Sequence, residues 1–365
     1  MKKWQIAVGV LAIVIIGSGA LGYTTVQDTL KPVDETDKTT IVYELKPGST
    51  PSSVLAELKE LDLIKNVAAA NLIVKQNDWS HIQAGKYELS RSLTLEEIFV
   101  KFESGEVAAP NTVKVTVPEG AILVEVAPQF ADIVNLSEDE FLEAINNEVF
   151  LTSLIEKYWF LTDELLNEEL NYPLEGYIYP ATYSFLADKT YTVETLVHTL
   201  LDVTAEKIAP LKEALEASSL TIHEVFALAS LVEAETPNTE EMPMVAGVFA
   251  NRLDQKMKLQ SDTTIQYVLD DRVVHVTGEM LTLESPYNTY YVSGLPVGAV
   301  GSPSFNALSA VLDPAKHEYI FFIGDLYECI DGKTHFFKTY DEHLDFYEKN
   351  LRPSYEAGYN VCKES

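Results

Sequence analysis

The sequence of 365 residues is poor in cysteine and in metal-binding patterns. Its two cysteines, Cys329 and Cys362, form no Cys-x-x-Cys pair, and no histidine cluster has the spacing of metal ligands. Neither a zinc site nor a redox motif is predicted, and we expect no metal and no other cofactor. Outside the cell a disulfide between the two cysteines is chemically permitted. The sequence leaves that bond open, because it does not give the distance between the two residues.

Basic residues are also scarce, since 26 Lys and Arg stand against 56 Asp and Glu, with a formal net charge of -30. Such a charge repels polyphosphate backbones, so we exclude nucleic acid as a partner. The acidic excess could serve a catalytic cleft. It could equally be a solubilising surface without a specific role.

One long apolar run lies at the N-terminus, from Trp4 to Tyr23, directly after Met1-Lys2-Lys3. At about 1.5 Å per residue, a helix of this length spans roughly the 30 Å hydrocarbon core of a bilayer. Lysines before the run and acidic residues after it predict a cytoplasmic N-terminus and an exported remainder. We therefore expect a single-pass cell-membrane protein anchored by residues 1–23. A cleaved signal peptide is the alternative, because Ser18-Gly19-Ala20 offers the small residues that a signal peptidase accepts.

The exported part is longer than one hydrophobic core usually holds, and its patterns divide it. Residues 24–39 are polar without a period, which predicts a linker. Residues 40–108 are predicted to form a strand, two helices, a strand and a final helix. The strand–helix–helix–strand order resembles a LysM-like carbohydrate-binding module; a small α+β spacer is the alternative. Residues 109–365 are predicted to form a larger α+β catalytic domain, with an accessory part at 109–200 and a catalytic part at 201–365. The expected fold class is α+β throughout.

The accessory part contains a tyrosine-rich segment between Leu174 and Phe185. Flat aromatic rings stack on the apolar faces of pyranoses, although most such clusters only fill a core. Both interpretations stay open. Before this segment, Thr112 to Val117 predicts a strand, and the Pro-Glu-Gly turn and amphipathic helix after it suggest a weak internal repeat of the first module.

Two glutamates, Glu233 and Glu235, lie at the end of a predicted buried helix that begins with a capping box of Thr221 and Glu224 and stops near Pro237. Residues two apart on a helix point about 200° apart, so only one carboxyl group faces a given cleft. The negative end of the helix dipole disfavours ionisation and raises the pKa of a carboxyl group there. That suits a general acid, whereas the alternative is a pair of surface glutamates.

Several long motifs then occur in one order, and together they resemble the endolytic transglycosylase family called MltG, or YceG-like. The motifs are L-E-G-Y-I-Y-P-A-T-Y-S-F at 174–185, L-A-S-L-V-E-A-E-T at 228–236, V-A-G-V-F-A-N-R-L at 245–253, M-K-L-Q-S-D-T-T at 257–264, E-S-P-Y-N-T-Y at 284–290, G-L-P at 294–296 and L-D-P-A at 312–315. With the anchor and the LysM-like module, the similarity covers nearly the whole chain. The sequence departs from the usual family pattern at Ala181, Ala234, Pro237, Thr263 and Val297.

The resemblance implies a peptidoglycan lytic transglycosylase in which Glu235 is the catalytic acid and Glu233 a supporting residue. Protonated Glu235 donates to the oxygen between N-acetylmuramic acid and N-acetylglucosamine, then accepts the proton of the muramoyl C6 hydroxyl, which leaves a 1,6-anhydro end. This double role requires a pKa of about 6 to 7 and partial burial. The candidate substrate-binding residues are Gln260, Asp262, Thr264, Tyr287, Asn288, Thr289 and Tyr290.

The anchor would restrict such an enzyme to nascent glycan strands near the membrane, where it would limit strand length. Expected partners are peptidoglycan strands, the membrane, peptidoglycan synthases and proteins of elongation or division. Two other functions stay open. One is a non-catalytic, membrane-anchored scaffold that binds peptidoglycan; the other is a hydrolase that uses Glu235 with Asp262 as the base.

Overall fold

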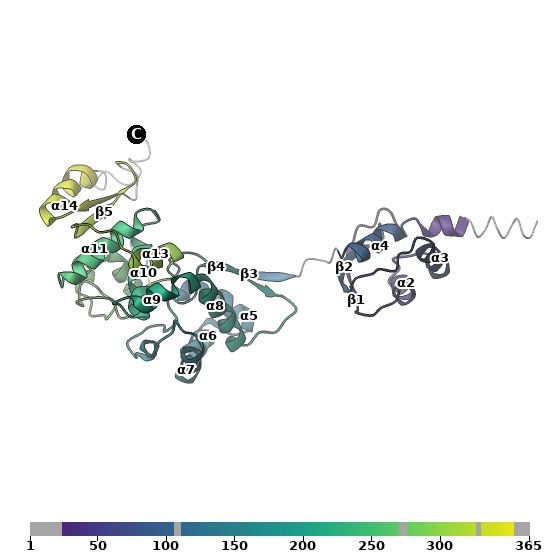
Figure 1. The fold of residues 1–365 in the computed structure, drawn as a ribbon, viewed down its shortest axis with the longest axis horizontal. Helices are drawn as coiled ribbons and strands as arrows, with labels where there is room; N and C mark the ends of the chain where they lie inside the picture. The colour runs from purple at the N-terminus through teal and green to yellow at the C-terminus, as the bar shows by residue number, and fades with distance from the viewer. Residues whose placement is uncertain (1–23, 106–110, 270–275, 326–329, 354–365) are drawn as a thin grey trace, which may run out of the picture. The chain divides into compact units, whose positions relative to one another are not determined.

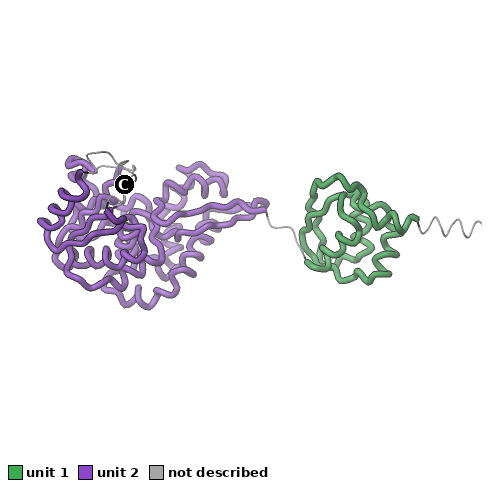
Figure 2. The backbone as a smooth tube through the Cα atoms, turned by 90° about the horizontal axis from the view of Figure 1, so that it is seen from above, with its two compact units in different colours: residues 1–110 green, residues 111–365 purple. Residues whose placement is uncertain are grey.

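A computed structural model describes residues 24–105, 111–269, 276–325 and 330–353. Its contacts divide the chain into unit 1, residues 1–110, and unit 2, residues 111–365 (Figure 2). Each unit is described by itself. The predicted anchor at 1–23 and both cysteines lie outside the described residues.

Unit 1 is built on an antiparallel pair of strands, β1 (Thr40–Leu45) and β2 (Gly85–Ser90), with Thr40 opposite Ser90. Between these strands the chain forms α2 (Pro51–Glu60) and α3 (Val67–Gln76), and α4 (Leu95–Ser104) follows β2 (Figure 1). The predicted order of strand, helix, helix, strand and helix is thus confirmed.

The segment predicted as a linker, residues 24–39, packs on unit 1. Val26 and Leu30 contact its apolar core, and Thr29 is buried. The Lys65 ammonium group lies 3.0 Å from the carboxylate of Asp28. Apolar burial and this ion pair therefore hold the segment that precedes β1 against the unit.

The first part of unit 2 is a second antiparallel pair, β3 (Thr112–Val117) with β4 (Ala181–Leu186). As in unit 1, helices occupy the chain between the two strands, and a long helix, α8 (Val193–Ile208), follows the second. The helices between the strands are α5 (Leu123–Val134), α6 (Glu138–Ile145), α7 (Glu148–Lys157) and the short 3-10 helix Asp163–Leu166.

The second part of unit 2 is organised around α10 (Ile222–Glu235), in which every side chain from Val225 to Val232 is buried. Helices α11 (Met242–Asp254) and α13 (Phe305–Leu312) pack on it. The remaining elements are 3-10 helix Ala209–Leu211, α9 (Lys212–Ala217), α12 (Asp262–Leu269), 3-10 helix Met280–Thr282, strands β5 (Phe321–Gly324) and β6 (Thr334–Phe337), α14 (Tyr340–Phe346) and π-helix Tyr347–Leu351.

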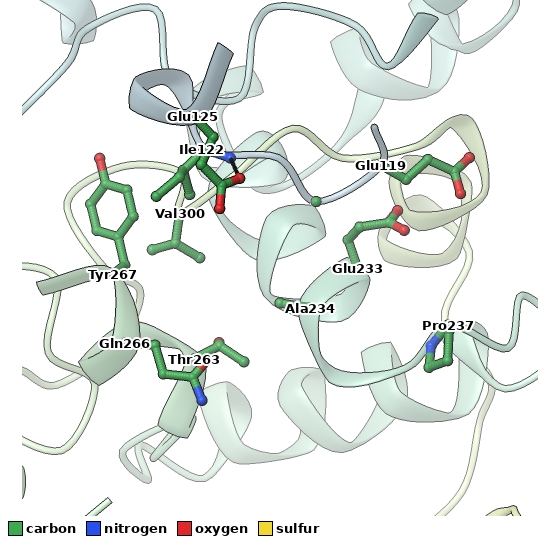
Figure 3. A pocket seen from close by; sticks show the side chains of 11 residues that line it. Glu119, Ile122, Glu125, Glu233, Ala234, Pro237, Thr263, Gln266, Tyr267 and Val300 are labelled. Atoms are coloured by element: carbon green, nitrogen blue, oxygen red, sulfur yellow. Dashed lines mark hydrogen bonds between the residues drawn. The ribbon is translucent and has the colours of Figure 1, made fainter. Parts of the chain in front are cut away.

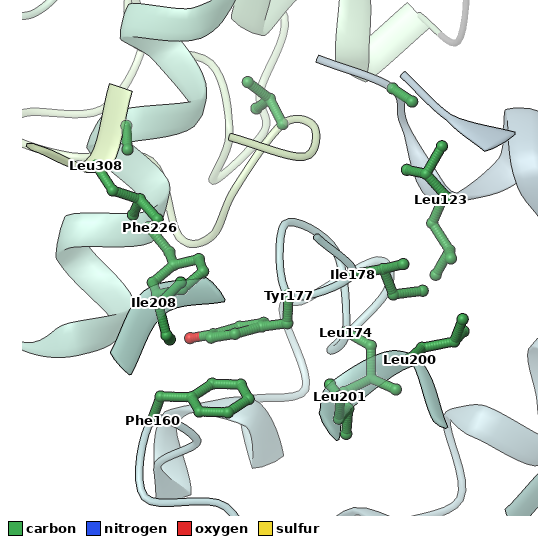
Figure 4. Packing of buried hydrophobic residues seen from close by; sticks show 14 of the residues in the cluster. Leu123, Phe160, Leu174, Tyr177, Ile178, Leu200, Leu201, Ile208, Phe226 and Leu308 are labelled. Carbon is green, nitrogen blue, oxygen red and sulfur yellow. The ribbon is translucent and has the colours of Figure 1, made fainter. Parts of the chain in front are cut away.

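The tyrosine-rich segment joins the two parts of unit 2. Tyr177 is fully buried and stacks on Phe226 of α10, with ring centroids 4.7 Å apart, and Phe160 lies on its other side (Figure 4). Tyr183 and Phe185 are buried in the same core. For these three rings, therefore, the structure favours the interpretation as core.

The described residues thus form a mixed α+β fold of helices and two-stranded antiparallel sheets. None of the helices in those residues is by itself both long and apolar enough to cross a membrane. The segments Val193–Ala217 and Ile222–Glu235 meet that test only when they are taken together, across a bend of 117°.

Candidate active site

Glu235 is the last residue of α10, and its carboxyl group is held in place by a hydroxyl group. Thr221 caps the start of the helix, as predicted. At the other end, the backbone becomes extended at Thr236, before Pro237. The hydroxyl of Ser261 donates a hydrogen bond of 2.6 Å to Oε1 of Glu235. The carboxyl group therefore has a defined orientation at the junction of α10 and the loop before α12.

Ser261 is itself fixed by two motifs that are far apart in the sequence. It is buried, and its backbone N–H donates to Oγ1 of Thr289 over 2.9 Å. Its carbonyl oxygen accepts a hydrogen bond of 2.7 Å from the Thr264 hydroxyl. The two threonine hydroxyls lie 3.1 Å apart. The 257–264 and 284–290 motifs thus meet beneath Glu235 and position its hydrogen-bond donor.

The electrostatic surroundings of Glu235 place its pKa at about 7. The residue is half-buried, and burial of its carboxyl group is the main cause, because removal from water disfavours the charged form. The Ser261 hydrogen bond and the Arg252 charge lower the pKa, whereas the Asp262 charge raises it. A carboxyl group with this pKa can both give and take a proton near neutral pH.

Arg252 of α11 links the loop beneath Glu235 to the C-terminal hairpin. Its guanidinium group donates to the carbonyl of Leu259 and to the carbonyl of Ile320, each over 2.6 Å. Burial lowers the pKa of this arginine. Within the same motif, the Asn251 amide donates to the carbonyl oxygens of His317 and Tyr319. The 245–253 motif therefore anchors the loop that leads to Ser261 and the segment directly before β5.

A cleft of about 430 Å³ lies beside the end of α10. Its wall includes Glu233 and Ala234, and Figure 3 shows Glu233 and Glu119 at one end and Tyr267 at the other. Thr263 also lines the cleft, and its hydroxyl lies 2.6 Å from that of Ser261. The prediction that the two glutamates point in different directions is consistent with this arrangement. Glu233 lines the cleft directly, whereas Glu235 is connected to the cleft wall through Ser261 and Thr263.

A fully buried carboxyl group close to the cleft residue Tyr267, that of Glu175, was not identified from the sequence. It accepts hydrogen bonds from the backbone N–H of Leu123, at 3.0 and 3.1 Å, at the start of α5. The Tyr267 hydroxyl, 3.5 Å away, also donates to it. Burial raises the pKa of Glu175 to about 8. Glu175 belongs to the 174–185 motif, which the sequence analysis interpreted only through its aromatic residues.

The next residue of that motif, Gly176, allows the turn at 174–176 to pack closely against residues 299–301 beside the cleft. Gly176 has φ +83°, and a Cβ atom there would lie 2.5 Å from the Cβ of Ala299. Only glycine accepts both the backbone conformation and the contact. The turn at 174–176 therefore lies directly against residues 299–301, next to the cleft residue Val300.

The seven candidate substrate-binding residues fall into two groups. Four are fully or almost fully buried and bond to the protein: Thr264, Tyr287, Asn288 and Thr289. Three keep exposed surface: Gln260, Asp262 and Tyr290. Asp262 accepts a hydrogen bond of 2.5 Å from the Tyr290 hydroxyl, and the backbone N–H of Gln260 donates to the carbonyl of Thr289. The structure thus brings both motifs together, with a minority of their side chains facing outward.

A half-buried carboxyl group of pKa about 7, oriented by a hydroxyl beside a cleft, has the properties that a general acid and base requires near neutral pH. The chain belongs to the YceG-like family, whose model matches residues 43–349.

Relatives and a solved structure agree with this assignment. The endolytic murein transglycosylase of Bacillus subtilis (strain 168) is 32% identical over 323 residues, which are 88% of each chain. That of Streptococcus pneumoniae serotype 2 (strain D39 / NCTC 7466) is 28% identical over 94% of this chain, which spans 64% of the streptococcal protein. The crystal structure of a putative YceG-like protein from Listeria monocytogenes is 31% identical, with a TM-score of 0.60, and the match covers 85% of this chain and 99% of that one.

Proposed function

We propose that the protein is an endolytic murein transglycosylase that cleaves glycan strands of peptidoglycan. The observation that carries the proposal is the carboxyl group of Glu235, with a pKa of about 7 and a fixed hydrogen-bond donor beside a cleft. Membership of the YceG-like family and relatives named endolytic murein transglycosylase support the same conclusion.

In the proposed reaction Glu235 is the only group that moves a proton. Its acid form protonates the oxygen between N-acetylmuramic acid and N-acetylglucosamine, and the bond from that oxygen to C1 breaks. The carboxylate then takes the proton of the muramoyl C6 hydroxyl while that oxygen bonds to C1. The products are a free N-acetylglucosamine hydroxyl and a 1,6-anhydro end, without consumption of water.

For substrate binding, the exposed candidates Gln260, Asp262 and Tyr290 can contact the glycan directly. The buried candidates Thr264, Tyr287, Asn288 and Thr289 act on binding by holding the loops that carry them. Of the buried group, Thr264 and Thr289 also position Ser261 and hence Glu235.

The location is part of the proposal. The apolar run at 4–23 would anchor the chain in the cell membrane with its N-terminus in the cytoplasm. Unit 1 has the strand and helix order of a LysM-like module, which would bind the same glycan. An enzyme held in this way acts on nascent strands and works beside synthases and proteins of elongation or division.

The decisive test is Glu235→Gln in the full chain, assayed on purified uncrosslinked glycan strands by mass spectrometry. The wild type should produce 1,6-anhydro ends, and the variant should lose roughly 1,000-fold in rate because the acid is gone. Glu240→Gln, at an exposed residue of the next loop, is the matched control and should retain activity. Glycan that stays uncleaved by the wild type and by Glu235→Gln alike would favour the scaffold, and cleavage that persists at the wild-type rate in Glu235→Gln would refute the role of Glu235. Reducing ends in place of anhydro ends would favour the hydrolase with Asp262 as base.

A further inference from the structure

The cleft contains a second carboxyl group that the one-carboxyl reaction does not use. Glu233 precedes Glu235 by two residues on α10 and lines the cleft together with Ala234 (Figure 3). It is half-buried, whereas the other cleft carboxyls, Glu119 and Glu125, are exposed. A charge that is partly removed from water acts more strongly on its surroundings than an exposed one.

A backbone N–H group holds the Glu233 carboxylate in place. The backbone N–H of Ser304 donates a hydrogen bond of 2.8 Å to its Oε2. Ser304 is the N-cap of α13, which packs against α10. Burial raises the pKa of Glu233 and the Ser304 hydrogen bonds lower it. A carboxylate that accepts hydrogen bonds in a fixed frame is suited to stabilise charge without moving.

Two turns beside Glu233 are joined to each other by backbone hydrogen bonds. The N–H of Gly120 donates to the carbonyl of Ser302 over 2.8 Å, and the N–H of Ser302 donates to the carbonyl of Ala121 over 2.9 Å. A Cβ atom at Gly301 would lie 2.8 Å from the Gly120 carbonyl oxygen. The turns at 118–122 and 300–304 therefore form one tightly packed support for this side of the cleft.

Glu233 lines the cleft directly, and Glu235 is connected to the same stretch of its wall through Ser261 and Thr263. Glu233 and Ala234 line it from α10, and Thr263 lines it from α12. The Thr263 hydroxyl is paired with that of Ser261, the hydrogen-bond donor to Glu235. A sugar that lies over Ala234 and Thr263 would thus have the proton donor on one side and a fixed negative charge on the other.

We propose that Glu233 is a second catalytic residue, whose carboxylate faces the sugar ring and stabilises the positive charge that develops at C1. The inference rests on the proposed function. During the reaction the proton passes from Glu235 to the glycosidic oxygen, which keeps the electron pair of the broken bond. The C6 oxygen then bonds to C1 and returns its proton to Glu235. Glu233 forms no bond and exchanges no proton, so its contribution is electrostatic.

Glu233→Gln separates the charge from the shape of the side chain, because the amide oxygen still accepts from the Ser304 N–H. We expect kcat on uncrosslinked glycan to fall roughly 100-fold, with KM and the thermal midpoint nearly unchanged. Glu119→Gln removes an exposed charge from the same cleft and should change kcat only a few-fold, since water screens it. Glu233→Asp keeps the charge and should be more active than Glu233→Gln.

Three results would overturn the inference. They are a wild-type kcat in Glu233→Gln, an equal loss of kcat in Glu119→Gln, and equal activities of Glu233→Asp and Glu233→Gln. If Glu233→Gln does not fold, Glu233→Asp decides alone: a measurable kcat in it would support the role, and an undetectable kcat in a folded Glu233→Asp protein would contradict it. A wild-type protein that forms no anhydro ends would instead refute the proposed function.

Discussion

In unit 1 the carboxyl groups with shifted pKa values lie at turns and helix N-termini, whereas three of those in unit 2 are enclosed by protein. Hydrogen bonds from Thr36, Thr39 and Thr94 lower the pKa values of Asp34, Asp37 and Glu97. In unit 2, burial raises the pKa values of Glu175, Glu233 and Glu235. The carboxyls of unit 1 stabilise local backbone structure, and the enclosed carboxyls of unit 2 are available for proton and charge chemistry.

The two units also differ in how their glycine turns are packed. Gly48 of unit 1 and Gly176 of unit 2 have nearly the same φ, +82° and +83°. A Cβ at Gly48 meets no atom within 4 Å, whereas one at Gly176 lies 2.5 Å from Ala299. The same local conformation is therefore a free surface turn in unit 1 and a packed part of the cleft wall in unit 2.

This pair of glycines gives the largest expected effect. Gly48→Ala should lower the free energy of unfolding by about 1–2 kcal/mol, the cost of left-handed backbone. Gly176→Ala adds a clash worth about 1–3 kcal/mol, and it should also reduce glycan cleavage because the wall near Val300 moves. Urea unfolding and the cleavage assay measure both effects. Equal losses of stability in the two variants would contradict the packing argument.

The pH dependence of stability should differ in sign between the units. Glu175 and Glu235 have folded pKa values of about 8 and 7, against an ordinary value of 4.5. The folded state then binds more protons than the unfolded state, so unit 2 loses stability as pH rises from about 4.5 to 8. For one such group, each unit by which the folded pKa exceeds the unfolded pKa changes the free energy of unfolding by roughly 1.4 kcal/mol over this pH range. The fully buried Glu175 should contribute most.

The lowered pKa values in unit 1 predict the opposite behaviour. Asp34, Asp37 and Glu97 stabilise unit 1 above their unfolded pKa values, and this contribution is lost as pH falls through the folded ones. Native-state hydrogen exchange of the full chain, corrected for intrinsic rates, can follow β1 and α10 separately. If unit 2 instead gained stability as the pH rose from 5 to 8, its carboxyl groups would not be enclosed. Glu175→Gln should flatten most of the slope.

A smaller effect is expected from Ser261→Ala, which removes the hydrogen bond to Glu235. That bond favours the charged form, so its loss raises the pKa of Glu235. The decline of kcat at high pH is expected near pH 7 in the wild type, and in Ser261→Ala it should move upward by as much as about one pH unit. Ser293→Ala, at an exposed position, is the control. An unchanged pH profile of kcat in Ser261→Ala would show that the Ser261 hydroxyl does not affect the pKa of Glu235.

The smallest effect is expected in unit 1. The Tyr43 hydroxyl donates to Oε2 of Glu57 over 2.7 Å. Tyr43→Phe should cost about 1 kcal/mol of stability and leave cleavage of soluble glycan unchanged, because the proposed catalytic carboxyls lie in unit 2. A clear loss of cleavage in this variant, with unit 1 still folded, would contradict the assignment of catalysis to unit 2 alone.

Much of the local structure could be predicted because it depends on neighbours in the sequence. The capping box at Thr221 depends on contacts within a few residues, and so do the individual helices of residues 40–108. The motif around Glu235 likewise identified the candidate acid and its place at a helix C-terminus. Helix geometry alone also predicted that Glu233 and Glu235 point in different directions.

The sequence by itself determined which residue types stand at the end of α10, and the tertiary structure decided what surrounds them. Glu233 faces the cleft, Ser261 holds Glu235, and Glu175 is buried at the start of α5, because segments distant in sequence meet there. Enclosure by such segments sets the polarity around a carboxyl group, and that polarity sets its pKa. The local pattern predicted a buried helix and a raised pKa at its end, but it does not show which distant segments enclose each carboxyl group, and only the folded chain does.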